Sequence, residues 1–568
     1  MPPLLLILAL YLGLQLPLPA TDVLTYRYNQ YGNGANTNEK SLNLDTVNPW
    51  DFGLKFTVPV PGQVYAQPLY KAGLGGKNLA FVATEHNVVL AIDTDRGTVV
   101  WSNALTDYGT PVPNEEIGSW DLVPEIGITS TPACDGSALF VLSKSRTPST
   151  NGNVLYSQTV YKIDLATGRT LVKNRFGLTL AHTDSNGIPD GDFTYPDNDP
   201  YVVGTGDGCI QTNGQNRVYF NALRQMNRAA LTLSGGVVYA GFASHGDIGP
   251  YHGWIIGFDA KTLALQTVFN TTPNGGWGGI WQSGGRLPSD NQGNLYFETG
   301  NGTFYGDLDS KGFPKDASYG DCFVKVTPDK NPSLAKTNPN GWGLKVTDYF
   351  TPTNNDQINW DDLDLGSCGP MVVPLKGKTV LIGTGKDGSL YSMNTAAMGK
   401  FDPATNRCLQ TINQAFVRQW DPGNRWTSFF TPTYLNGKIY AFSSLDFGKQ
   451  FTLSTNGMIG SWYVDGNGLV QTDVESDNTY ALDWPGANTT ISANGTNGVI
   501  LWAIDRNASV LRAYRASDLL QIWHSDQVPA DNFSGAIKFS VPVVADGKVF
   551  VGTEGALQIF GLTPAERH

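Results

Sequence analysis

Short runs of alternating apolar and polar residues occupy most of this chain. Clear examples lie at 79–84, 237–242 and 380–384, and Gly-Lys, Asp-Gly or Asn-Gly pairs precede several such runs. A period of two residues is the pattern of a β-strand, and these dipeptides are typical of the tight turns of hairpins. The pattern therefore predicts an all-β protein built from hairpins.

The hairpins belong to a repeat. Its clearest copy spans 90–101, where a strand is followed by Asp93, then Gly97 in a turn, then Trp101. Weaker copies lie at 160–171, 256–265 and 511–523. Repeats at intervals of a few tens of residues predict a propeller or a solenoid, and the outer strand that carries a tryptophan favours the propeller. Strand pairs begin near residues 79, 138, 236, 294, 379, 438, 499 and 548, which predicts about eight blades with long insertions at 173–232 and 306–365.

Composition agrees with this architecture. Charged residues make up 15% of the 568 residues and aromatic residues 11%, with 65 Gly and 33 Pro, as expected for short strands joined by tight turns. No shift in composition marks a second domain, so we expect one domain over 21–568. The net charge of −12 includes no cluster of Lys and Arg, which argues against a nucleic-acid-binding protein.

The first 20 residues predict export. Residues 1–20 form an apolar run interrupted by proline and ending at Ala20, which is the pattern of a signal peptide and is too short to span a membrane. We therefore expect a secreted, extracellular protein without a membrane span. Glycosylation acceptor sequences support export and predict a glycoprotein; they begin at Asn270, Asn301, Asn488, Asn494, Asn507 and Asn532. Five cysteines without a Cys-x-x-Cys-His sequence exclude an attached c-type haem.

The unit Ala-x-Asp-x-x-x-Gly-x-x-x-Trp at 91–101 resembles the tryptophan-docking repeat of the pyrroloquinoline quinone (PQQ) dehydrogenases. In that family the indole lies between neighbouring blades. Segments such as 64–69, 124–129, 279–284 and 362–366 are similar to those of a poorly characterised secreted subgroup of PQQ-repeat proteins. The resemblance covers nearly the whole mature chain and implies a β-propeller of the quinoprotein alcohol dehydrogenase type.

The resemblance also implies a site of five residues. Asp247 and Asn301 match calcium ligands of the family, and Trp281 matches the ring beneath the quinone. Asp321 matches the catalytic aspartate, which also lies at the metal, and Lys386 matches the cation beside the quinone carbonyls. Calcium prefers oxygen ligands of this kind. The implied cofactors are PQQ and calcium, and both Asp321 and Lys386 would be catalytic.

This sequence departs from the family at several positions. The adjacent cysteine pair beside the quinone is absent, Asp247 stands where Glu is usual, and His252 replaces an arginine. Asn301 also begins a glycosylation sequence, and a glycan there is incompatible with metal binding.

Structural roles compete with each of these assignments. Aspartate and asparagine suit turns at strand ends, Trp281 suits a packed core, and Lys386 suits a solvated turn. His86, His245 and His252 near strand ends offer a transition-metal site as a further alternative.

Two functions follow from the sequence. The first is a secreted PQQ- and calcium-dependent dehydrogenase of small alcohols or sugars that passes electrons to an external acceptor. The second is a non-catalytic or repurposed propeller that binds a glycan or a protein partner. Because propellers host many functions, the fold alone does not decide between them.

Overall fold

The computed structural model describes residues 21–148, 152–184, 186–329, 332, 335–413, 415, 426–442, 444–445, 459–471, 475–477, 482 and 485–563. The expected signal peptide therefore lies outside the described residues. The described part is nearly all β and contains two short α-helices, α1 (Asn114–Ile117) and α2 (Asn355–Trp360). Neither of these helices has the length and apolar character needed to cross a bilayer.

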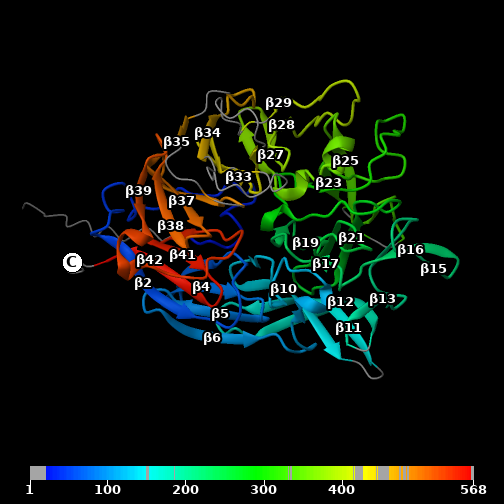
Figure 1. Ribbon diagram of the computed structural model, residues 1–568, viewed down its shortest axis with the longest axis horizontal. Helices are drawn as coiled ribbons and strands as arrows, with labels where there is room; N and C mark the ends of the chain where they lie inside the picture. Colours follow the sequence, from blue (N-terminus) through cyan, green and yellow to red (C-terminus); the bar gives the residue numbers. More distant parts are fainter. Residues whose placement is uncertain are drawn as a thin grey trace, which may run out of the picture.

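Antiparallel sheets follow one another in chain order around a common centre (Figure 1). The first sheet contains β3 (Leu69–Leu74), β4 (Lys77–Ala83), β5 (Val88–Asp93) and β6 (Thr98–Ala104), and the second contains β9 (Ala133–Cys134), β10 (Ala138–Pro148), β11 (Asn153–Asp164), β12 (Thr170–Thr183) and β13 (Pro189–Thr194). The third contains β17 (Gln225–Met226), β18 (Thr232–Ser234), β19 (Val237–Ser244), β20 (Trp254–Asp259), β21 (Leu265–Asn270) and β24 (Gly341–Trp342). The fourth contains β22 (Leu295–Glu298), β23 (Phe323–Pro328) and β25 (Leu344–Phe350).

The later sheets repeat this arrangement. They are β26 (Met371–Leu375), β27 (Lys378–Thr384), β28 (Leu390–Asn394) and β29 (Gln410–Ile412); β31 (Thr433–Leu435), β32 (Lys438–Phe442), β34 (Ile459–Tyr463) and β35 (Glu475–Asp477); β1 (Ala35–Asn36), β36 (Thr489–Asn494), β37 (Asn497–Asp505), β38 (Val510–Arg515) and β39 (Gln521–His524); and β2 (Phe52–Pro59), β40 (Val543–Ala545), β41 (Lys548–Gly552) and β42 (Ala556–Leu562).

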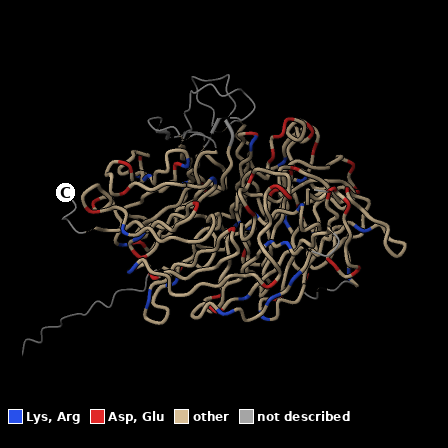
Figure 2. Tube along the Cα trace, turned by 60° about the horizontal axis from the view of Figure 1, so that its bottom comes forward, with Lys and Arg blue, Asp and Glu red and all other residues tan. Residues whose placement is uncertain are grey.

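Three small sheets lie outside this series: β7 (Val112–Pro113) with β8 (Glu125–Ile126); β14 (Tyr201–Val203), β15 (Ile210–Thr212) and β16 (Gln215–Tyr219); and β30 (Trp426–Thr427) with β33 (Ser444–Leu445). Positions of both charge signs are distributed along the trace (Figure 2).

The predicted propeller fold is confirmed, and so are the predicted strand starts. Each of the eight starts lies within two residues of the first residue of a strand, namely β4, β10, β19, β22, β27, β32, β37 and β41. The number of blades stays a prediction, since undescribed residues interrupt the β31–β35 sheet. The two predicted insertions are only partly loops: 173–232 contains most of β12 and the β14–β16 sheet, and 306–365 contains β23 and β25, which complete the sheet begun by β22.

Aromatic side chains dock two of the outer strands, β6 and β2, onto the next sheet. Trp101 of β6 donates its indole N–H to the carbonyl of Leu165 (3.2 Å), and a Cβ at Gly168 would lie 2.5 Å from its ring. Phe56 of β2 makes the same contact with Gly97, where a Cβ would lie 2.5 Å from its ring. The glycine of the repeat therefore leaves room for an aromatic ring of the neighbouring sheet.

The ring of sheets is closed by the two ends of the chain. Strand β2, near the N-terminus, pairs with the C-terminal strand β42 from Phe52 opposite Leu562 to Pro59 opposite Ala556. The last sheet therefore contains strands from both ends. Among the described residues, this pairing brings the last sheet of the series next to the first and so closes the ring.

The N-terminal segment 23–34 ties the inner edges of the sheets together. Main-chain or side-chain hydrogen bonds join it to strands of six sheets, at Tyr70, Cys134, Val372, Tyr434, Ile491 and Val544, and to Ser289, which forms a β-bridge with Leu295 of β22. Arg27 is fully buried and donates to the carbonyls of Gly32 (3.1 Å) and Pro432 (2.9 Å) and to the Thr433 hydroxyl (2.8 Å). The segment thus runs along the inner edges of these sheets and is hydrogen-bonded to them.

The predicted glycosylation sequences divide into two groups. Asn494, Asn507 and Asn532 are exposed, whereas Asn270, Asn301 and Asn488 are buried and have no room for a glycan in the folded chain. All five cysteines are free thiols. Glycosylation at the three exposed positions stays a prediction.

Replacing Gly168 with alanine will destabilise the protein by more than backbone strain alone. Its φ of +71° disfavours any other residue, and the new methyl group meets the Trp101 ring. Strain and overpacking each cost about 1–3 kcal/mol. Gly76 is the matched control, because its φ is +77° and a Cβ there meets nothing within 4 Å. We expect thermal unfolding to show a clearly larger fall in Tm for G168A than for G76A; equal falls would contradict docking through this glycine.

Candidate functional site

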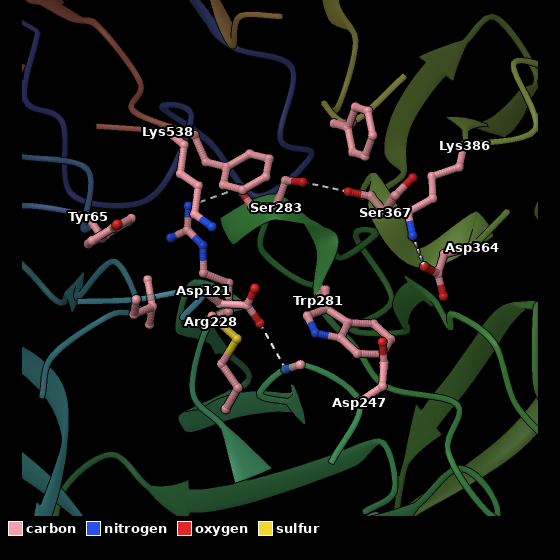
Figure 3. A pocket seen from close by; sticks show the side chains of 15 residues that line it. Tyr65, Asp121, Arg228, Asp247, Trp281, Ser283, Asp364, Ser367, Lys386 and Lys538 are labelled. Carbon is pink, nitrogen blue, oxygen red and sulfur yellow. Dashed lines mark hydrogen bonds and ion pairs between the residues drawn. The ribbon is translucent and has the colours of Figure 1, made fainter. Parts of the chain in front are cut away.

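A cavity of about 240 Å³ lies where loops from most of the sheets meet (Figure 3). Its lining combines acidic, basic and aromatic side chains, which are Tyr65, Asp121, Leu122, Met226, Arg228, Gly246, Asp247, Trp281, Ser283, Asp364, Ser367, Lys386, Phe429, Lys538 and Phe539. Three of the five residues predicted from the sequence are among them: Asp247, Trp281 and Lys386. Sites built from several strand-end loops on a rigid scaffold are the usual location of function in such folds.

Trp281 is held in one orientation. It lies just before a short 3-10 turn, η2 (Gln282–Gly284), and its indole N–H donates to the carbonyl of Ser244 (3.0 Å). Two glycines pack against the ring, since a Cβ at Gly279 would lie 2.7 Å from it and one at Gly300 2.6 Å. The ring is therefore fixed on backbone on one side and forms part of the cavity wall on the other.

Asp247 follows strand β19 in a strained conformation. Its φ is +55°, in the left-handed region, and its Oδ1 accepts hydrogen bonds from the Tyr251 hydroxyl (2.8 Å) and the Ser244 hydroxyl (3.4 Å). Burial raises the pKa of this carboxyl, and repulsion from Asp364 raises it further. No hydrogen bond reaches Oδ2 from the part of the chain that the structure describes. Asp247 thus presents a carboxyl oxygen that is free for a ligand.

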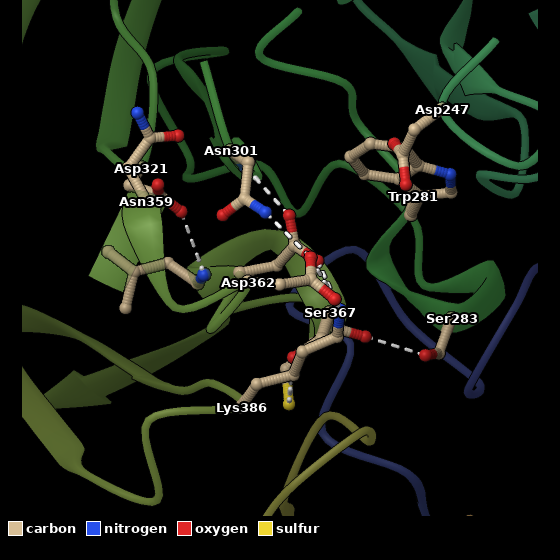
Figure 4. Close-up of polar contacts among 12 residues, drawn as sticks. Asp247, Trp281, Ser283, Asn301, Asp321, Asn359, Asp362, Ser367 and Lys386 are labelled. Carbon is tan, nitrogen blue, oxygen red and sulfur yellow. Dashed lines mark hydrogen bonds and ion pairs between the residues drawn. The ribbon is translucent and has the colours of Figure 1, made fainter. Parts of the chain in front are cut away.

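Lys386 is fixed by two carboxylates (Figure 4). Its ammonium lies 2.5 Å from Oδ2 of Asp364 and 3.4 Å from Oδ1 of Asp362. Burial lowers the pKa of Lys386, but attraction to the two carboxylates outweighs burial and holds the pKa above its usual value. Lys386 is therefore a charged, immobilised cation in the cavity wall, not a solvated turn residue.

Asn301 and Asp321 lie one layer behind the cavity wall. Asp364 accepts the backbone N–H of Asn301 at Oδ1 (2.7 Å), and Asp362 accepts its side-chain amide N–H (2.7 Å). Asp321 is fully buried and accepts the backbone N–H of Leu365 at Oδ1 (3.1 Å). Burial, then repulsion from Asp364, raises its pKa well above the usual range. The predicted set is thus one connected cluster, but only part of it faces the cavity.

Two buried oxygens in this layer lack a hydrogen-bond partner: Oδ1 of Asn301 and Oδ2 of Asp321. Leaving a buried acceptor unsatisfied costs about 1–3 kcal/mol, so such an atom calls for an explanation. A hard cation that takes oxygen ligands would satisfy both.

Backbone strain is concentrated in the same cluster. Asp321 (φ 47°), Asp362 (φ 57°), Gln282 (φ 50°) and Ser283 (φ 46°) join Asp247 in the left-handed region. Non-glycine residues in this region cost about 1–3 kcal/mol each and tend to occur at functional sites. Their concentration around one cavity supports a functional role for it.

Sequence reasoning missed the residue that connects the cluster. Asp364 contacts both Lys386 and Asn301, yet its segment 362–366 was recognised only as a shared motif without an assigned role. The two acidic residues within four positions were the available signal.

The opposite side of the cavity is cationic. Arg228 donates to the carbonyls of Thr129 (3.4 Å) and Ser283 (3.3 Å), and its guanidinium lies 5.8 Å from the Tyr65 ring centre and 5.7 Å from that of Phe539. Lys538 lies beside it, and burial lowers the pKa of that lysine. The cavity therefore has Arg228 and Lys538 on one side, near Asp121, and the ion pair of Lys386 and Asp364 on the other.

The three candidate histidines do not converge. His86 contacts Glu125 (2.7 Å), His245 contacts the Lys144 ammonium (2.9 Å), and His252 contacts the Thr272 hydroxyl (2.9 Å). Within the described residues no three His, Cys, Asp or Glu side chains converge as a metal site. The transition-metal alternative is wrong for these histidines.

Glu85 is a buried acid near the cationic end of the cavity. Its Oε2 accepts the Gly127 N–H (2.7 Å) and the Thr129 hydroxyl (3.1 Å), whereas its Oε1 has no partner. Burial raises its pKa from 4.5 to about 7, against opposing hydrogen bonds. The folded protein therefore retains this proton at pH values where the unfolded chain has released it.

This linkage predicts a pH-dependent effect of E85Q. An acid with a raised folded-state pKa stabilises fully below its unfolded pKa, and this contribution is lost as pH rises from 4.5 to about 7. The wild type should therefore lose on the order of 3 kcal/mol relative to E85Q across this window.

Thermal melts of both proteins from pH 4.5 to 8 provide the measurement. The exposed Glu554 supplies the control variant E554Q, which should follow the wild-type curve. Parallel curves for wild type and E85Q would show that the Glu85 proton is not retained on folding.

Comparison with known proteins identifies the fold. No family model matches the sequence, and no curated protein matches it. The solved structure of quinohemoprotein alcohol dehydrogenase from Comamonas testosteroni is similar, with 14% identity, a TM-score of 0.57, and coverage of 95% of this chain and 80% of that chain. A quinohemoprotein alcohol dehydrogenase from Pseudomonas putida HK5 is also similar, with 14% identity, a TM-score of 0.56, and coverage of 95% of this chain and 80% of that chain.

A europium-containing methanol dehydrogenase is similar over a larger share of its own length. It is 12% identical, has a TM-score of 0.55, and aligns over 95% of this chain and 98% of that chain. Identities this low establish architecture and no activity. The chain therefore has the propeller fold found in quinohemoprotein alcohol dehydrogenases, as its docking repeat predicted.

Proposed function

We propose that the cavity at Trp281 binds a planar quinone cofactor of the PQQ class together with a hard cation. We further propose that the protein is a secreted dehydrogenase of alcohols or sugars. The observation that carries this proposal is the fixed Trp281 ring in the wall of a cavity that three basic side chains also line, Arg228, Lys386 and Lys538. Aromatic rings prefer offset stacking on other planar systems, so an immobilised indole suits a flat cofactor.

The basic end suits a cofactor that carries carboxylates. PQQ is a tricarboxylate, and Arg228 and Lys538 line the cavity at the end away from Asp364. A guanidinium binds carboxylates through paired N–H donors, and partial burial strengthens such contacts. These two side chains would hold the acidic edge of the cofactor.

The layer behind the wall suits a cation. The partner-free oxygens of Asn301 and Asp321 would supply an amide and a carboxylate ligand. The family resemblance implies Asp247 as a third ligand, but Oδ1 of Asp247 already accepts two hydrogen bonds and the residue lines the cavity, where its other oxygen would meet the substrate. Calcium accepts this oxygen set, and so do lanthanide ions, one of which occurs in a methanol dehydrogenase of this fold. Lys386 would remain beside the cofactor carbonyls, held there by Asp364.

When bound, the quinone would supply the acceptor for the two electrons removed from the substrate carbon. The chain itself must accept the hydroxyl proton. The sequence assigns this role to Asp321, yet the geometry favours Asp247, because its Oδ2 faces the cavity and its raised pKa suits a proton acceptor. The reduced site would then pass electrons to an external acceptor, since the sequence has no haem attachment motif.

Titration with PQQ tests the proposal directly. Purified protein should bind PQQ with quenching of tryptophan fluorescence, and calcium or a lanthanide should tighten the binding. W281A should weaken PQQ binding at least tenfold, because the stacking surface is lost. The control is W50A, which removes an exposed tryptophan from the turn before β2. Absence of PQQ binding in the micromolar range, with either cation, would leave the non-catalytic propeller as the better account.

Two carboxyl variants test which residue accepts the hydroxyl proton of the substrate. With PQQ bound and dye reduction as the readout, D247N should lower kcat by about 10²–10⁴-fold, which is the usual contribution of a general base. D321N should instead weaken cation binding, measured by titration calorimetry. The reverse pattern would return the proton to Asp321, as the family resemblance implies.

A further inference from the structure

Four exposed aromatic side chains lie close in sequence to residues of the cavity wall or of the layer behind it. Among the described large apolar residues, Trp360 is 87% exposed, Trp120 74%, Tyr305 73% and Trp277 46%. Each of the four lies next to a segment that forms the cavity wall or the layer behind it. Exposed aromatic residues gathered in one region mark a binding surface.

Trp277 is connected to the cavity through two ring contacts, one stacked and one edge-to-face. Its ring centre lies 6.4 Å from that of Tyr251 in parallel orientation, and the Tyr251 ring lies 6.0 Å from Trp281. Trp277 also has a φ of +66°, although four glycines surround it in sequence. A bulky residue is strained in this conformation, which favours glycine. Position 277 nevertheless carries a tryptophan, and its indole is partly exposed to solvent.

Trp360 ends a helix that is firmly anchored. In α2, the amide of Asn355 donates to the carbonyl of Gly320 (3.0 Å) and the Thr351 hydroxyl (2.8 Å), and Asn359 accepts the Gly302 N–H (2.9 Å). Trp277 forms a β-bridge with the same Gly302. Trp277 and Trp360 therefore both border the 301–302 segment, and their positions are fixed by backbone contacts.

Two further rings complete the rim. Tyr305 follows on the loop that begins at Asn301. Trp120 stands on another side of the cavity, next to Asp121, which lines the cavity and accepts the Gly246 N–H (2.8 Å) beside Asp247. We define the aromatic rim as Trp120, Trp277, Tyr305 and Trp360.

We propose that the aromatic rim binds an uncharged oligosaccharide whose terminal unit enters the cavity. The flat C–H faces of sugar rings pack on exposed indole and phenol rings, and sugar hydroxyls bind carboxylates and amides. The rim alternates rings with polar groups of this kind, at Asp121, Asp361 and Asp362. A lipid or an apolar peptide would need a continuous apolar surface instead.

The negative charge beside the rim limits the kinds of saccharide that it can bind. The carboxylates beside the rings would repel uronic acids and sulfated sugars, because like charges brought together are unfavourable. This inference deepens the proposed function, since it names the substrate class of the same site. Binding to the rim does not require the cofactor, however, so the two proposals can fail separately.

Calorimetric titration without cofactor tests the rim. The probes are cellohexaose, maltohexaose and xylohexaose, with hexagalacturonate as the anionic counterpart. At least one neutral hexamer should bind, and W277A/W360A should weaken this binding at least tenfold. W50A is the matched control and should bind as the wild type does.

Three outcomes would overturn the inference: no neutral hexamer binds, the double variant binds like the wild type, or hexagalacturonate binds more tightly than every neutral hexamer. If the protein also oxidises sugars, the double variant should raise KM for the hexamer at least tenfold and leave KM for the monosaccharide and both kcat values unchanged. Failure of PQQ binding with intact saccharide binding would remove the proposed dehydrogenase and keep the rim.

Discussion

Hydrogen bonds between the segment 23–34 and the first strands of the sheets determine where the inner edges of the propeller stand. Inner strands such as β9 and β40 are only two or three residues long, so they have few contacts of their own. The segment is hydrogen-bonded to six of them, and Arg27 buries its charge among carbonyl groups at the centre. Since the cavity is lined by loops that leave these edges, its dimensions depend on this one piece of chain.

The contacts of Asp364 show how loops from different sheets are held together at the site. Asp364 holds Lys386 from one side and Asn301 from the other, so residues from two sheets share one carboxylate. Buried ion pairs of this type are costly to form, and their value lies in fixing geometry. The strained backbone at Asp247 and Asp321 is a second cost at the same place. Both costs are understandable if the cluster is organised to receive a ligand.

The sequence predicted the architecture well, because its signals are local. Alternation, turn dipeptides and the spacing from Asp93 to Trp101 involve neighbours in the chain, and the structure agrees with them. It predicted the site less completely. Which of Asp247 and Asp321 faces the cavity depends on the path of the 362–366 segment between sheets, and no local pattern encodes that path. The role of Arg27 was invisible for the same reason, since its partners Pro432 and Thr433 lie more than 400 residues away.

The pairing of β2 with β42 has a consequence for biosynthesis. The sheet that begins with residues 52–59 cannot be completed until residues 556–562 have left the ribosome, some 500 positions later. Loop closure over such a distance is slow, and until then the chain exposes an unpaired edge that can associate with other chains. A propeller closed in this way stays prone to association until its C-terminal strand has been made, and removal of that last strand would leave the ring open.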